Sequence, residues 1–271
     1  MPNTSPGLEG RLLVDWARKA EAGPFTSLGV LDRAAYDSIE PFVALAAAAG
    51  ATSTIRLVTM VAIGPLRAAA LLAKQAASLD ALSGGRLVLG LSIGARHDDY
   101  RSLGVDHRDR GAVLTDHLLA IRDHWEDGRV GPSTGSPSVL VGGSSGEAFA
   151  RMARYGDGYV HGGGPPRAFA GAAARARAAW ADLGRPGHPR LWGQGYFALG
   201  AEALDSGAAY LRDYYAFTGP FAEKIAAANL TTPQAVVDFI RGYEEAGCDE
   251  LVLFPTVPVL DQLDRLADVV T

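Results

Sequence analysis

The sequence predicts an α/β protein with the architecture of a (β/α)8 barrel, also called a TIM barrel. Strand-like and helix-like segments alternate almost from one end of the chain to the other, which is typical of a parallel sheet with helices outside it. The strand-like segments are nearly free of polar residues, as strands buried on both faces are. The chain has 271 residues, about the length of one such barrel. We therefore expect a single domain over residues 1–271.

Seven segments are predicted to be strands. They are short, rich in branched apolar residues and bounded by Gly, Pro or charged residues. The longest reads IRLVTMVAI and has almost no polar side chain. In chain order, the predicted strands are Ser27–Leu31, Ile55–Ile63, Arg86–Ile93, Val139–Val141, Gly158–His161, Leu191–Leu199 and Glu250–Phe254.

Nine segments are predicted to be helices. The first illustrates the reasoning, because Leu12, Leu13, Trp16 and Ala20 recur at helical spacing before a Gly-Pro pair ends the helix. The predicted helices are Leu8–Ala20, Pro41–Ala49, Leu66–Leu82, Leu114–Trp125, Ser145–Tyr155, Pro165–Leu183, Glu202–Tyr215, Pro233–Ala246 and Val259–Val270.

The predicted barrel lacks its first strand. The chain begins with a helix, and the segment before it, Met1–Gly7, is too short and too rich in proline to supply a strand. Two alternatives remain: the start of the chain is truncated or mis-assigned, or the barrel is open at this place. Two Pro- and Gly-rich stretches, Gly128–Pro137 and Gly162–Pro166, are predicted to be loops within the domain.

Composition and charge exclude several classes of protein. The net charge of −5 offers no general attraction for nucleic acid. No apolar run reaches the roughly 18 residues that a membrane helix needs, and the first ten residues do not resemble a secretory signal. The single cysteine, Cys248, excludes an internal disulfide framework and fits a reducing compartment. We expect a cytoplasmic protein without a nucleic-acid or membrane partner.

The sharpest candidate site is residues 139–147, VLVGGSSGE, where a strand runs through two glycines into a helix. In (β/α)8 barrels the site lies at the carboxyl ends of the strands. Gly142 and Gly143 permit close approach of a ligand to the backbone. Ser144 and Ser145 precede a helix whose free N–H groups attract phosphate. The segment predicts a phosphate site, and the alternative interpretation is an ordinary, well-capped turn.

A serine hydrolase is a second interpretation of the same segment. Residues 142–146 match the G-x-S-x-G elbow, with Ser144 as the nucleophile. Such a hydrolase needs an acid and then a histidine later in the chain. Only His161 and His188 follow Ser144, and neither comes after the last strand. The sequence therefore disfavours a hydrolase.

The other strand ends carry weaker signals. His161 closes a strand before three glycines, where it can donate a proton, hydrogen-bond a ligand or simply line the rim. Asp32, after the first predicted strand, is a second weak candidate for catalysis. Gly94 and Arg96 follow another strand, where the guanidinium can neutralise an anionic ligand or form an ordinary salt bridge. His97 and the acids beside it have no second ligand cluster at a usual spacing, so no metal site is predicted.

Several segments together carry a family resemblance that covers about residues 12–266. The most specific stretch is residues 71–90, LLAKQAASLDALSGGRLVLG. It continues through YRSLGV at 100–105, VGGS at 141–144, ARYGDGY at 153–159 and EAGCDELVL at 245–253. In these segments the chain resembles the bacterial luciferase-like family of flavin- and deazaflavin-dependent oxidoreductases.

The resemblance implies a TIM barrel that binds FMN or the deazaflavin coenzyme F420 at the carboxyl ends of its strands. It implies that Gly142, Gly143 and Ser144 hold the phosphate-bearing part of the cofactor. It also implies a bulged strand beside one face of the flavin ring, with a non-proline cis peptide bond that we place at Met60–Val61. The expected cofactor-binding residues are Thr59, Met60, Val61, Gly94, Arg96, Gly142, Gly143, Ser144, Ser145 and His161.

The resemblance further implies an oxidoreductase or monooxygenase that acts on a small organic substrate. With FMN the reaction would be an oxygen-dependent monooxygenation, with a flavin reductase as a partner. With F420 it would be a hydride transfer. The family often dimerises, so a homodimer is also expected.

Two departures from the family leave the catalytic acid or base unassigned. The first strand is absent, and the Asp-His pair that follows the second strand in many deazaflavin members reads Asp32-Arg33 here. A member that binds a ligand without turnover is therefore the alternative to an active enzyme.

Overall fold

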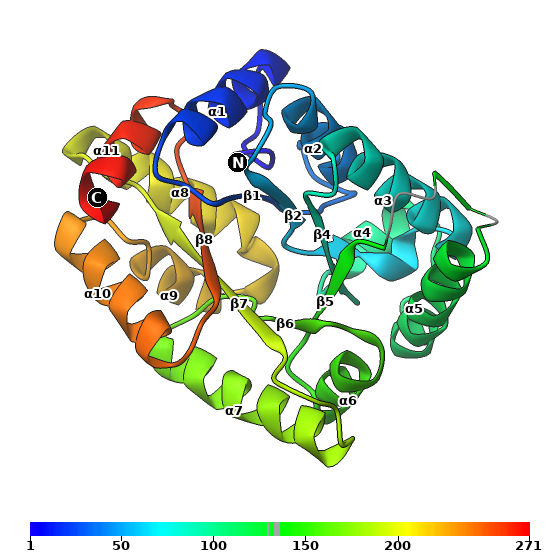
Figure 1. Cartoon of the computed structure of the whole chain (residues 1–271). Helices are drawn as coiled ribbons and strands as arrows, with labels where there is room; N and C mark the ends of the chain where they lie inside the picture. Colours follow the sequence, from blue (N-terminus) through cyan, green and yellow to red (C-terminus); the bar gives the residue numbers. More distant parts are fainter. Residues whose placement is uncertain (129, 133–135) are drawn as a thin grey trace.

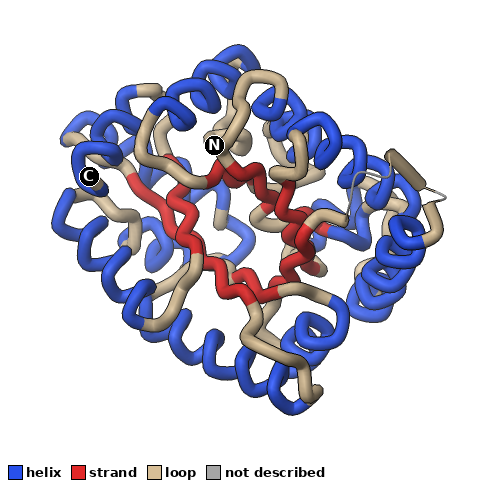
Figure 2. Tube along the Cα trace, viewed as in Figure 1, coloured by secondary structure: helices blue, strands red, loops and turns tan. Residues whose placement is uncertain are grey.

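Seven parallel strands curve into a nearly closed barrel with helices around its outside, as Figure 1 shows and as Figure 2 shows by element type. The computed structural model describes residues 1–128, 130–132 and 136–271. Neighbouring strands pair in the order β1-β2-β4-β5-β6-β7-β8, and the short β3 pairs with β4. The strands are β1 (Ser27–Val30), β2 (Arg56–Thr59), β3 (Ala62–Ile63), β4 (Leu87–Ser92), β5 (Ser138–Gly142), β6 (Gly158–Val160), β7 (Arg190–Phe197) and β8 (Glu250–Pro255).

All nine predicted helices are present, and the described residues contain two further α-helices that were not predicted. The additions are α4, which lies in the charged loop after β4, and α9, which lies between β7 and β8. Of the predicted loop 128–137, residues 129 and 133–135 lie outside the described part of the chain. The helices are α1 (Gly10–Ala22), α2 (Pro41–Ala49), α3 (Ala69–Ser83), α4 (His97–Ser102), α5 (Arg110–Glu126), α6 (Gly146–Tyr155), α7 (Pro166–Asp182), α8 (Leu204–Tyr214), α9 (Phe221–Ala227), α10 (Pro233–Glu245) and α11 (Asp261–Val270).

Barrel strands alternate their side chains between two cores, as the two-residue period of a strand requires. Leu57 and Leu89 point outward and pack in the core shared with the helices. Val58 and Val88 point inward and pack in the core that fills the barrel. In the described ranges, no helix is both long and apolar enough to cross a membrane.

The predicted strand Ile55–Ile63 is wrong as a single element, because it is broken into β2 and β3. The peptide bond Met60–Val61 is cis, at the position that the family resemblance implied. At the break, the Thr59 hydroxyl donates to the Gly90 carbonyl at 2.7 Å and accepts from the Gly90 N–H at 2.9 Å. The Thr59 side chain thus takes the place of the backbone hydrogen bonds to β4 at this point. Gly90 has no room for a side chain, because a Cβ there would lie 2.1 Å from the Thr59 carbonyl oxygen.

The barrel is open between β1 and β8, and we call this opening the seam. Within the described residues no strand pairing joins the two strands. Side chains bridge its base, where Glu250 accepts a hydrogen bond from Thr26 at 2.5 Å and pairs with Arg56 at 3.3 Å. The missing first strand belongs between β1 and β8. The predicted TIM-type barrel without its first strand is therefore confirmed.

Candidate functional site

A cavity of about 880 Å³ opens at the carboxyl ends of the central strands. We call it the mouth pocket. It extends from Met60 across Ser92 and Gly142 to His161 and Gln194. These residues come from separate strands or from the loops directly after them, so the fold gathers them from distant parts of the sequence. This is the face on which (β/α)8 barrels carry their sites.

One end of the mouth pocket is the turn from β5 into α6. Gly143 has a φ of +134°, and a Cβ there would lie 2.6 Å from the Ala148 side chain. Ser145 is the N-cap of α6, since its hydroxyl accepts from the Ala148 N–H at 3.2 Å. The turn is held from below by Tyr159, whose hydroxyl donates to the Gly143 carbonyl at 2.9 Å. The positive end of α6 therefore faces the pocket with bare backbone beside it, which suits an anion.

Arginine side chains surround the same end of the pocket. Arg108, Arg110 and Arg151 all line it. The Arg151 guanidinium is fixed by donating to the Thr115 hydroxyl and the Gly111 carbonyl, each at 2.9 Å. Among the described residues no acid is hydrogen-bonded to this guanidinium, and Glu147, which also lines the pocket, interacts with it electrostatically. The electrostatics and the glycine turn thus favour the same chemical group, a phosphate or carboxylate.

The opposite wall of the pocket is apolar. Met60 and Val61 line it on either side of the cis peptide bond. Gly94 lines it from the loop after β4, with a φ of +66° and no room for a Cβ, which would lie 2.9 Å from the Ile63 side chain. A flat, uncharged ring fits this wall better than a charged group does.

His161 stands at the end of β6, between the two walls. Burial lowers the pKa of its imidazole below 6.5, and Arg175 adds to this effect, whereas a hydrogen bond with the Gly163 backbone opposes it. Burial therefore disfavours the charged form of the ring. Its Nδ1 lies 3.5 Å from the Tyr159 hydroxyl, and its Nε2 is buried without a hydrogen-bond partner. A buried, unpaired ring nitrogen in a pocket is available to a ligand.

Three residues proposed from the sequence lie outside the lining of the mouth pocket. Thr59 is buried at the break between β2 and β3. Asp32 accepts two hydrogen bonds from Arg67, at 2.6 and 3.1 Å, and one from the Ile63 N–H at 2.8 Å. Burial raises the pKa of Asp32, against the opposing effect of Arg67. Its carboxylate thus ties the end of β1 to the segment after β3.

Arg96 reaches away from the pocket into an aromatic cluster on the segment between β7 and β8. Its guanidinium donates to the Tyr214 carbonyl at 2.8 Å and lies 4.3 Å from the Tyr214 ring centroid and 4.4 Å from that of Phe217. Tyr214 and Tyr215 pack in or against the core that fills the barrel. These contacts hold the guanidinium in place, while the Nε of Arg96 is buried without a hydrogen-bond partner.

Arg33, which stands where the family resemblance implied a histidine, is held in place by two acids. Its side chain is 4% exposed and lies 2.9 Å from Asp99 and 2.8 Å from Asp98. Asp99 also accepts from the N–H groups of Ala34 and Ala35, both at 2.8 Å. The guanidinium therefore fixes the loop after β1 and is not a free acid or base.

Sequence reasoning missed several residues that line the pocket. Ser92 and Gln194 lie inside predicted strands, and only the barrel's inward face distinguishes them. Arg110 and Arg151 lie on helices, where nothing local shows that they face β5. In the described ranges, no three or more His, Cys, Asp or Glu residues gather as a metal site.

The comparisons with known proteins agree with this geometry. The family model described as luciferase-like monooxygenase matches residues 2–235. The chain belongs to the luciferase-like monooxygenase family. Most of the barrel, including the whole β5–α6 turn, lies within the matched residues.

Curated proteins of similar sequence include an uncharacterised protein and a monooxygenase. An uncharacterised protein of Mycobacterium tuberculosis is 33% identical over 187 residues, 55% of this chain and 65% of that protein. The pyrimidine monooxygenase RutA of Escherichia coli is 32% identical over 171 residues, 55% of this chain and 47% of RutA. The match to these curated relatives thus spans between about half and two thirds of their length.

A solved structure extends the likeness over nearly the whole fold. An F420-dependent secondary alcohol dehydrogenase, solved with an F420-acetone adduct, superposes with a TM-score of 0.82. The match covers 97% of this chain and 94% of that one, at 15% sequence identity. At that identity the likeness concerns the fold alone.

Proposed function

We propose that this protein is an oxidoreductase that binds a flavin-type coenzyme, FMN or F420, in the mouth pocket and acts on a small organic substrate. One observation carries the proposal. The pocket joins an apolar wall at Met60 and Val61 to an anion-binding end at the β5–α6 turn. That combination matches a coenzyme with a flat ring system at one end and a phosphate-bearing chain at the other.

The residues of the pocket fit such a coenzyme. Gly142 and Gly143 let the phosphate approach the backbone, and the N–H groups at the start of α6 bind it. Arg151 adds a fixed positive charge. Met60 and Val61 support one face of the ring. The unpaired Nε2 of His161 is placed to hydrogen-bond the ring or the substrate, as donor or acceptor according to its tautomer.

The protein's contribution is binding, orientation and electrostatics. The coenzyme, when bound, supplies the redox chemistry, either oxygen activation with FMN or hydride transfer with F420. A neutral His161 can donate a hydrogen bond, or exchange a proton, without placing a positive charge against the ring. FMN-dependent turnover would also require a flavin reductase as a partner.

A titration with the two coenzymes tests the proposal. The purified protein is titrated with FMN and, separately, with F420, and coenzyme fluorescence is followed. We expect saturable binding of one of them, weakened about tenfold by Ser144→Ala and by Arg151→Met, since each removes a phosphate contact worth roughly 1.4 kcal/mol. Ser206→Ala, on the exposed face of α8, is the matched control and should bind as the unchanged protein does.

Other outcomes separate the alternatives. If neither coenzyme binds, the proposal fails. Binding without electron transfer to any substrate would favour the non-catalytic member of the family. Labelling of Ser144 by a phosphonate probe would favour the hydrolase.

A further inference from the structure

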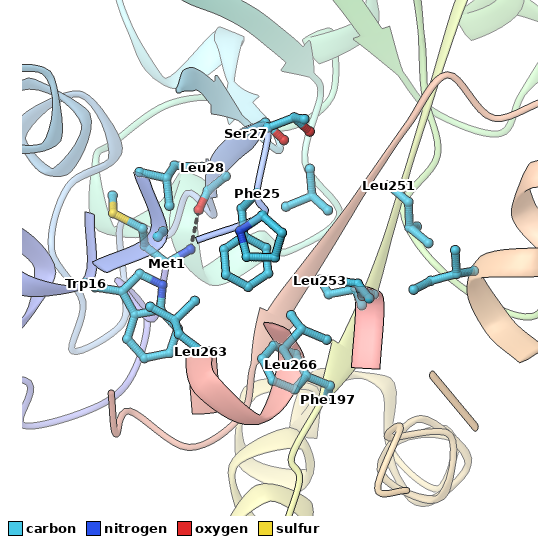
Figure 3. A pocket seen from close by; sticks show the side chains of 17 residues that line it. Met1, Trp16, Phe25, Ser27, Leu28, Phe197, Leu251, Leu253, Leu263 and Leu266 are labelled. Carbon is cyan, nitrogen blue, oxygen red and sulfur yellow. Dashed lines mark hydrogen bonds between the residues drawn. The ribbon is translucent and has the colours of Figure 1, made fainter. Parts of the chain in front are cut away.

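The charged side chains around the mouth pocket are mostly positive. Its lining includes three arginines and one acid, which are Arg108, Arg110, Arg151 and Glu147. The protein as a whole has a net charge of −5, so this positive excess is local. The groove at the seam, drawn in Figure 3, has no charged side chain among its described lining residues. The positive charge therefore gathers at one cavity, whose walls strengthen its effect on an anion.

The positive lining continues from the β5–α6 turn to the start of α5. Arg151 comes from α6, and its guanidinium donates to the Gly111 carbonyl in the first turn of α5 at 2.9 Å. Arg110 and Gly111 are the first two residues of α5, and both line the pocket. The pocket thus extends past the phosphate turn to α5. Glu147 is engaged at the start of α6, where hydrogen bonds with its own backbone and with the Ser145 hydroxyl lower the pKa of its carboxyl.

Arg110 has hydrogen-bonding capacity that the protein does not use. Its Nη1 donates to the His107 carbonyl at 2.9 Å and lies 3.0 Å from the His107 Nδ1. Its Nε is buried without a hydrogen-bond partner. Within the described ranges no ion pair joins Arg110 to an acid. A guanidinium with a buried, unpaired N–H group is available to an anionic ligand.

Arg108 lies at the outer rim of the pocket. Its side chain is 86% exposed and pairs at 2.6 Å with Asp106, which is itself 54% exposed. Such an exposed ion pair contributes little to stability, so a ligand carboxylate can take the place of Asp106 at small cost. Arg110 and Arg151 are half-buried. The three guanidinium groups thus lead from the enclosed phosphate end of the pocket to its open rim.

We propose that Arg108 and Arg110 form a second anion-binding subsite, which takes a carboxylate-bearing chain that continues from the phosphate of the coenzyme. This inference rests on the proposed function and chooses between its two coenzymes. The phosphate of FMN is a terminal group, so FMN would leave the second subsite empty. The phosphate of F420 is a diester that continues into a lactyl group and a chain of glutamates, whose carboxylates suit guanidinium groups near the rim. The second subsite therefore favours F420.

Titrations with two forms of F420 test the second subsite. One form carries the glutamate chain, and the other ends at the lactyl group, so the two share the ring and the phosphate. Coenzyme fluorescence is followed at low salt and without substrate, so that any difference belongs to the glutamates. We expect the glutamate-bearing form to bind about tenfold more tightly, since two exposed ion pairs contribute roughly threefold each. High salt should reduce this preference.

Substitutions assign the preference to the two arginines. The double variant with Arg108→Gln and Arg110→Gln should bind both forms of F420 equally. Arg108→Gln alone changes an exposed side chain, and it should reduce the preference about threefold. Ser144→Ala acts at the phosphate, so it should weaken both forms by the same factor. The matched control is Arg18→Gln on α1, because Arg18 is 61% exposed, lies 3.4 Å from Asp15 and does not line the pocket. This control should keep the full preference.

Different results would overturn the second subsite and the proposed function. Equal affinity of the unchanged protein for both forms of F420 would remove the second subsite and leave the coenzyme site intact. A preference that survives in the double variant would show that the glutamates bind elsewhere. Binding of FMN without binding of F420 would support the proposed function and overturn this inference. Binding of neither coenzyme would overturn both.

Discussion

Arg33 has a structural role that can be argued at the scale of a single residue. Its guanidinium is buried against Asp99, which is itself fully buried, and it lies 4.9 Å from the Tyr36 ring centroid. Removing one partner of such a pair leaves a buried charge without compensation. Arg33→Met should therefore destabilise the protein by about 3–5 kcal/mol, measured by urea unfolding.

The matched control for Arg33 is Arg11, whose side chain is 88% exposed and 4.0 Å from Asp15. An exposed pair at this distance contributes little, so Arg11→Met should change the free energy of unfolding by less than about 0.5 kcal/mol. Equal effects of the two substitutions would show that Arg33 does not fix the loop after β1.

The break between β2 and β3 is the informative feature at the scale of elements. Thr59 replaces a ladder bond with its hydroxyl, and both groups of Gly90 that it bonds are buried. Thr59→Val keeps the shape but leaves a buried N–H and C=O without partners. We expect a loss of about 2–4 kcal/mol in unfolding free energy, against less than about 1 kcal/mol for Thr54→Val at the exposed loop before β2. Unchanged stability in Thr59→Val would show that water or the backbone satisfies Gly90.

This break also marks the limit of what the sequence predicts about elements. Residues 55–63 are almost all apolar, so their composition predicts one strand, and nothing local reveals that Thr59 bonds across to β4. Helix α4 was missed because its six residues, HDDYRS, have no apolar period. The β5–α6 turn was predicted well, since strand, glycines and N-cap are consecutive. Gln194 and Arg151 were not, because only barrel closure brings them to that turn.

At the scale of the whole molecule, the fold matches that of a protein with only 15% sequence identity. Such a match is expected when the core consists of apolar side chains that can replace one another. The amino terminus contributes to the pH dependence of the protein's stability. The Met1 amine is buried and its pKa falls from 8.0 to about 5. Between pH 8 and pH 5 the amine is mostly protonated in the unfolded chain and mostly neutral in the folded protein. Folding therefore releases a proton in this range, and the free energy of unfolding decreases as the pH falls.

We expect the free energy of unfolding to decrease by about 3 kcal/mol between pH 8 and pH 5 from this amine alone. The pKa values of His107, His117 and His161 are also lowered by burial, so these imidazoles add to the slope as the pH approaches 6.5, and a protein without the buried amine is needed for comparison. Urea unfolding at pH 8.0, 7.25 and 6.5 measures the slope. A variant with a short Gly-Ser extension before Met1 lacks this buried amine and should show a shallower slope over the same interval. Matching slopes in both proteins would assign the pH dependence to other groups.

The two chain ends differ in a way that matters for handling the protein. Thr271 is exposed at the end of α11, whereas Met1 lies in the seam, above the bridge that Thr26 and Arg56 make to Glu250. An affinity tag fused to Met1 would have to run down the seam and leave past that bridge, whereas a tag on Thr271 meets no such obstacle. Purification through the carboxyl end should therefore preserve the native packing around Met1.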